Sequence, residues 1–152
     1  AKGWAMTGWR IGWLAGHEAV IKAAAALQSQ STSNVCTFAQ YGALAAVNGP
    51  RDCVRAMAEQ FNSRRQRLSD GLRSIEGVQL QPPEGAFYAF PDVSHYGLDS
   101  MSLCNRLLDE VGLAVVPGIA FGDDGCIRLS CAASEATIDD GLERLQRFLS
   151  AL

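Results

Sequence analysis

Three basic side chains, those of Lys2, Arg10 and Arg128, are the first candidates for chemistry in this sequence. A lysine amine forms an imine with an aldehyde only when it is neutral, and burial or a cationic neighbour favours that state. An arginine presents paired donors to two oxygens of one anion, and Gly8 and Gly12 leave room beside Arg10 for close approach. Taken singly, Lys2 is better explained as a surface lysine, and Arg10 as a salt-bridged arginine at a strand end.

Arg128 belongs to the run GCIRLSC at residues 125–131, which alternates as a β-strand does. Ile127, Leu129 and Cys131 share one face of that strand, and Arg128 lies on the other. Core contacts on the first face would therefore hold Arg128 outward. By alternation alone, a solvated strand arginine explains this position better than a binding residue does.

Four runs carry a resemblance to a known family. They are AKGWAMTGWRIG at residues 1–12, PEGAFYAFP at 83–91, VVPGIAFG at 115–122 and GCIRLSC at 125–131. In this order they resemble the aspartate aminotransferase family, fold type I enzymes that use pyridoxal 5'-phosphate. The resemblance extends from Lys2 to Leu152 and corresponds to the C-terminal part of the family's chain.

The resemblance implies a role for each of the three basic residues. Lys2 would hold the cofactor as a Schiff base and, once released, move the α-proton of the substrate. Arg10 would hold the cofactor phosphate, and Arg128 would receive the substrate α-carboxylate. The implied substrates are an amino acid and a 2-oxo acid, and the implied parent protein is a homodimer.

The same resemblance implies an α/β fold, the C-terminal part of the PLP-dependent transferase fold. Residues 1–50 would be a remnant of the large cofactor-binding domain, and residues 51–152 a long bridging helix followed by a small mixed α/β (α+β) domain. In complete family members the preceding segment supplies the acid that pairs with the ring nitrogen of the cofactor. We therefore expect this chain to be a fragment that has an incomplete cofactor pocket and is inactive by itself.

Two other functions fit the same residues. Lyases and decarboxylases share fold type I and much of this constellation, so another class of PLP enzyme is the first alternative. The second is a non-enzymatic small-lobe interaction module that keeps the motifs without using them. Aspartate preference is a family expectation, because residues outside this segment largely set it. The run STSN at residues 31–34 resembles a family loop near the dimer contact, and we assign it no catalytic role.

Composition argues against several further classes. Thirteen basic and sixteen acidic residues give a net charge of -3, and the only basic cluster lies at residues 64–67, so we expect no nucleic-acid partner. Apolar stretches such as 23–27 are far shorter than the roughly 18 residues of a membrane span, so we expect a soluble protein. The five cysteines form no Cys-x-x-Cys pair. This spacing favours free thiols in a reducing cytoplasm over disulfides or a metal site.

Local patterns predict the elements that position the three basic residues. Residues 9–14 alternate as a strand, and the polar run at 28–34 separates helices at 17–27 and 37–47. A helix of about 25 residues is predicted from Pro50 to near Gly77. Further strands are expected at 78–80, 86–90, 113–116 and 126–131, and helices at 100–111 and after a Ser134 cap. The aromatic side chains of 83–91 and 115–122 are interpreted as packing.

Overall fold

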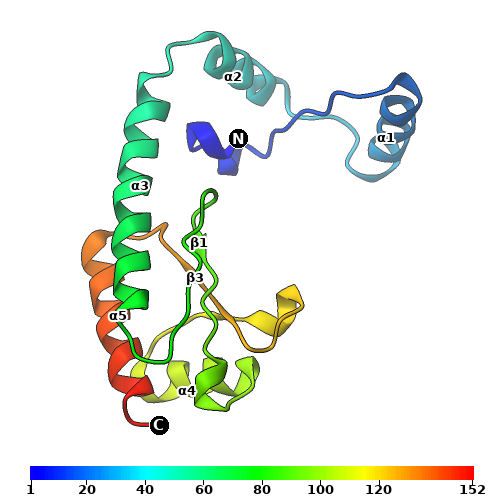
Figure 1. The fold of residues 1–152 in the computed structure, drawn as a ribbon. Helices are drawn as coiled ribbons and strands as arrows, with labels where there is room; N and C mark the ends of the chain where they lie inside the picture. Colours follow the sequence, from blue (N-terminus) through cyan, green and yellow to red (C-terminus); the bar gives the residue numbers. More distant parts are fainter. The chain divides into compact units, whose positions relative to one another are not determined.

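The first 57 residues fold mainly as helices. The computed structural model describes residues 1–152 and divides into one unit of Ala1–Met57 and another of Ala58–Leu152 (Figure 1). The first unit contains the short 3-10 helices η1 (Lys2–Trp4) and η2 (Thr7–Trp9), then α1 (Glu18–Ser31), α2 (Thr37–Asn48) and the start of α3 (Asp52–Arg73). Ala39 is the only residue of α1 and α2 that is buried.

The predicted helices at 17–27 and 37–47 are confirmed as α1 and α2, but the loop predicted at 28–34 starts too early. Helix α1 continues to Ser31, and the Ser29 and Ser31 hydroxyls donate to main-chain carbonyls of the preceding turn at 2.8 Å and 3.0 Å. These serine side chains bond back to their own helix and do not end it.

The strand predicted at residues 9–14 is wrong. Trp9 closes a 3-10 turn, Arg10 has a left-handed backbone with φ of 50°, and residues 11–14 have no strand pairing. A strand needs a neighbour to receive its N–H and C=O groups, and no segment of this chain pairs with these residues. Side-chain alternation alone could not reveal that.

Helix α3 follows the predicted apolar stripe but is shorter than predicted. It spans 22 residues and begins at Asp52, two residues after Pro50. Leu68 and Leu72 on the stripe are buried. After Arg73 the chain turns, and Gly77 takes a left-handed φ of 75°. The predicted assignment of residues 1–50 and 51–152 to separate domains stays a prediction; the two compact units divide within α3.

The second unit is built around a small antiparallel sheet. Strands β1 (Tyr88–Ala89), β2 (Val116–Pro117) and β3 (Ile127–Ser130) lie in the order β1-β3-β2. Each strand is shorter than predicted, and the strand expected at 78–80 contributes only a single bridge between Gln79 and Asp92. Many of the remaining backbone groups are instead bonded in turns, as expected for a small lobe rich in loops.

Two further helices, α4 (Ser100–Val111) and α5 (Glu135–Leu149), complete the second unit. Figure 1 shows α5 beside the C-terminal part of α3, in agreement with a bidentate pair between Arg67 and Asp139. The core contains fully buried leucines from three helices and Ile127 from β3; the leucines are Leu72, Leu103, Leu107 and Leu145. No helix is both long enough and apolar enough to cross a membrane.

Candidate active site

Lys2 and Arg10 line the same pocket in the first unit. The pocket has a volume of about 370 Å³, and its other lining residues are Ala1, Thr7, Ile11 and Gly12. Both side-chain charges on its wall are positive, and no carboxylate lines it. Such a set of donors favours an anionic ligand.

Arg10 is held by its own backbone turn. It caps η2 in the left-handed region, which non-glycine residues seldom adopt, and its Nη1 donates to the Thr7 carbonyl at 3.0 Å. The Nε and Nη2 donors have no partner within this chain. A Cβ built at Gly8 or Gly12 would meet no atom within 4 Å, so the space beside Arg10 is open. Arg10 can therefore present its remaining donors to an anion.

The residue before Arg10 anchors this turn to α2. A Cβ at Gly42 would overlap the Trp9 indole, so the ring lies directly on the helix where glycine leaves room for it. Trp9 is still 46% exposed. This contact between Trp9 and Gly42 fixes the position of the η2 turn, and with it the position of Arg10, relative to α2.

The pocket fits two parts of a phosphate-bearing aldehyde. Arg10 and the positive charge beside it suit a phosphate dianion, and Lys2 supplies an amine that can condense with an aldehyde. No acidic or aromatic side chain lines this pocket. A ligand of that kind would meet a guanidinium and an amine on this wall, and no acid for the nitrogen of a pyridine ring.

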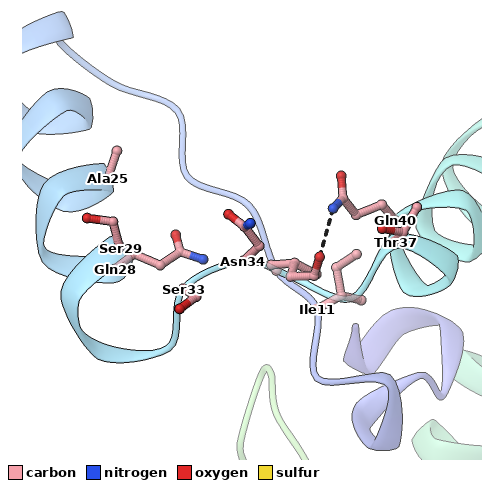
Figure 2. A pocket seen from close by; sticks show the side chains of 10 residues that line it. Ile11, Ala25, Gln28, Ser29, Ser33, Asn34, Thr37 and Gln40 are labelled. Carbon is pink, nitrogen blue, oxygen red and sulfur yellow. Dashed lines mark hydrogen bonds between the residues drawn. The ribbon is translucent and has the colours of Figure 1, made fainter.

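A larger pocket of about 520 Å³ shares Ile11 and Gly12 with the first and extends to the segment between α1 and α2 (Figure 2). Ser33 and Asn34 line it, so the structure places part of the STSN run near the turn that carries Arg10. Gln40 donates to the Val35 carbonyl at 2.9 Å, which ties α2 to this segment. None of its lining side chains is ionisable.

Arg128 lies in the second unit, in contact with two aromatic rings. Its guanidinium carbon is 4.3 Å from the centroid of the Tyr88 ring and 4.4 Å from that of Phe121. Alternation correctly placed Arg128 opposite the fully buried Ile127. The prediction missed both rings. Tyr88 comes from β1 and Phe121 from η4 (Gly118–Phe121), and only the strand register brings them to Arg128.

The structure therefore brings Lys2 and Arg10 together in one unit, whereas Arg128 belongs to the other. Thr7 was also missed, and the signal for it was weak, because its carbonyl acts through a local turn. The thiols near β3 take no part in this chemistry. Burial raises the pKa of the Cys126 thiol to about 11, so it carries little of the thiolate form that reacts.

Comparison with known proteins identifies the family. Residues 1–145 match the family described as aminotransferase class I and II, and the chain belongs to that family. It is 45% identical to a probable aspartate/prephenate aminotransferase from Aquifex aeolicus, over 100% of this chain and 40% of that protein.

Solved structures give the same result for the fold. The aspartate aminotransferase from Rhizobium meliloti superposes with a TM-score of 0.92 at 37% identity, over 97% of this chain and 40% of that one. An aromatic aminotransferase from Pyrococcus horikoshii superposes with a TM-score of 0.92 at 33% identity, over 98% of this chain and 41% of that one. The predicted fold, the mixed α/β C-terminal part of a fold type I transferase, is confirmed. The chain spans about 40% of the length of these relatives.

Proposed function

We propose that this chain supplies the C-terminal part of the active site of a PLP-dependent amino acid aminotransferase, which transfers an amino group to a 2-oxo acid. The observation that carries the proposal is the shared pocket of Lys2 and Arg10, an amine and a guanidinium on one wall with no acid between them. Membership of the aminotransferase family supports it. Two relatives are named as an aspartate/prephenate and an aspartate aminotransferase, which makes L-aspartate the first substrate to test.

Pyridoxal 5'-phosphate is the cofactor that the family implies, and when bound it supplies an electron sink for the substrate α-carbon. Lys2 would hold it through Nζ, and Arg10 would hold its phosphate through the donors that Thr7 leaves available. The Lys2 amine would then accept the α-proton at Nζ and return it to another carbon, which is general base and acid work.

Arg128 would bind the α-carboxylate of the amino acid. It forms no ion pair within the chain, and its in-plane donors match the two oxygens of a carboxylate. Binding that group restricts rotation of the substrate and so orients the Cα–H bond for proton removal.

The whole protein is proposed to be a cytoplasmic homodimer that acts in amino acid metabolism, and the 152-residue chain to be inactive by itself. Five free cysteines support a reducing compartment. The absence of an acid from the pocket supports inactivity in isolation, because the ring nitrogen of the cofactor needs such a partner.

The test is an assay of the full-length protein with L-aspartate and 2-oxoglutarate, following both glutamate and oxaloacetate. Equal amounts of the two products are expected. Carbon dioxide or ammonia without glutamate would instead identify a decarboxylase or a lyase. If none of these products forms with any of several amino acids, the protein is a non-enzymatic interaction module and the proposal fails.

The chain offers a matched control for the role of Lys2. Lys22, its only other lysine, lies on α1 and pairs with Glu18 at 2.7 Å. Lys2→Ala should lower kcat by about 10³-fold or more, because the proton-transfer group is lost, whereas Lys22→Ala should leave kcat unchanged. Equal rates for the two variants would remove Lys2 from the mechanism.

A further inference from the structure

The guanidinium of Arg128 lies over two aromatic rings, those of Tyr88 and Phe121. The Tyr88 and Phe121 centroids lie 4.3 Å and 4.4 Å from its central carbon. All three side chains belong to the compact unit Ala58–Leu152, and the two rings come from segments more than thirty residues apart in the sequence. We call these two rings and Arg128 the aromatic clamp.

The clamp follows from the strand register. Tyr88 pairs with Ser130, so it is the diagonal neighbour of Arg128 on the same face of the sheet. Val116 pairs with Arg128 on the other side, and the chain passes directly from β2 into η4, which carries Phe121. Phe90 contacts the Phe121 ring edge-to-face at 6.0 Å. Both walls of the clamp are therefore supported by elements of this lobe.

The contacts with the two rings restrict how the Arg128 side chain can bind a ligand. All the N–H donors of a guanidinium lie in its plane, and an aromatic ring attracts the cation through its π-face. Two rings at contact distance therefore hold the guanidinium in place and restrict the rotamers open to it. A carboxylate bound in the bidentate mode also lies in that plane. Arg128 held in this way can therefore offer paired in-plane donors to one carboxylate.

We propose that Tyr88 and Phe121 are positioning residues that act through Arg128 to fix the place at which the substrate α-carboxylate binds. This inference rests on the proposed function and extends it, because it assigns a task to two aromatic side chains that the sequence suggested were packing.

The test measures the dissociation constant of succinate, an unreactive dicarboxylate, in the full-length protein. Tyr88→Leu and Phe121→Leu should each weaken binding roughly five-fold, because one cation–π contact is lost. Tyr88→Phe and Phe121→Tyr keep the ring and should bind like the wild type. In the reaction, the two leucine variants should raise KM more than they lower kcat.

A double-mutant cycle separates positioning from general loss of structure. Arg128→Leu should weaken succinate binding by about 100-fold, and adding Tyr88→Leu to it should cause no further loss. If Tyr88→Leu keeps its five-fold effect in the absence of Arg128, or if Tyr88→Phe is as weak as Tyr88→Leu, the clamp has no positioning role. If Arg128→Leu itself binds normally, the proposed role of Arg128 fails first, and the clamp proposal falls with it.

A spectroscopic measurement on the 152-residue chain tests the clamp without catalysis. Ring currents should shift the Arg128 side-chain NMR resonances upfield in the wild type and in Tyr88→Phe, and much of that shift should vanish in Tyr88→Leu. Arg128 resonances at the positions of an exposed arginine in the wild type would overturn the proposal.

Discussion

The two units of this chain differ in how much of their own apolar surface they bury. In the second unit, the large residues Leu72, Leu103, Leu107 and Leu145 are fully buried. In the first, Trp13, Phe38 and Leu27 are 87%, 74% and 72% exposed. These large apolar side chains of the first unit are therefore in contact with water. Arg128 thus stands on a lobe with its own core, whereas Lys2 and Arg10 stand on a region that has almost none.

The largest predicted change in stability tests that difference, through the replacement of one leucine in each unit. Leu107→Ala, in the core of the second unit, should lower the free energy of unfolding by about 2–5 kcal/mol, because it leaves a cavity among packed side chains. Leu27→Ala on α1 should change it by less than about 0.5 kcal/mol, because that side chain is already in water. Urea denaturation followed by circular dichroism measures both. Similar losses of unfolding free energy in the two variants would contradict the difference between the units.

A glycine beside the aromatic clamp gives the next largest effect. A Cβ at Gly118 would overlap the carbonyl oxygens of Asp123 and Cys126, which are backbone atoms and cannot move aside cheaply. Gly118→Ala should therefore cost about 1–3 kcal/mol of stability and displace η4 with Phe121. Gly85→Ala is the control, since nothing lies within 4 Å of its Cβ. Thermal unfolding that is unchanged in Gly118→Ala would show that η4 is not held by this contact.

Much of the second unit is predictable from the sequence because its signals are local. The bounds of α4 agree to the residue, since Asp99 caps one end through the Ser102 N–H and Gly112 supplies a left-handed end. The Ser134 cap of α5 was predicted for the same reason. The strand at 9–14 failed because strand formation depends on a partner that alternation does not reveal.

Prediction of the candidate site from the sequence is limited in the same way, because it cannot show which distant segments meet. The resemblance to the family implied roles for Lys2 and Arg10, which stay a prediction, and the structure places both residues on one pocket. The rings that clamp Arg128 escaped notice because their meeting depends on the register between β1 and β3 and on the turn after β2. Those are tertiary facts, and no local pattern in residues 83–91 or 115–122 encodes them.

A smaller effect on stability is expected at the helix caps, which differ between the two units. The Ser134 hydroxyl accepts from the Thr137 N–H at 3.1 Å, whereas Cys36, in the equivalent position before α2, makes no side-chain cap bond. Ser134→Ala should cost about 1 kcal/mol, and Cys36→Ala should cost almost nothing. Denaturant midpoints of the two variants provide the measurement. An equal loss at Cys36 would reveal a cap contribution in the first unit.

The smallest effect concerns pH. Arg67 donates to Asp139 at 2.5 Å and 2.7 Å and holds the pKa of that carboxyl below its ordinary value. Because the folded-state pKa is the lower one, the pair stabilises the lobe above the unfolded-state pKa and loses that contribution as pH falls through the folded-state value. Wild type and Asp139→Asn should therefore differ in melting temperature at pH 7 and converge in strong acid. A difference in melting temperature that grows on acidification would contradict this prediction.

Hydrogen–deuterium exchange of the 152-residue chain, read by mass spectrometry, tests the comparison most directly. We expect amides of β3, α4 and α5 to be protected by nearly the full stability of the second unit, and those of η2, α1 and α2 to exchange far faster. That result would mean that Arg128 is positioned by a self-sufficient lobe and that Lys2 and Arg10 are not. Equal protection of Ile127–Ser130 and Glu18–Ser31 would contradict the account.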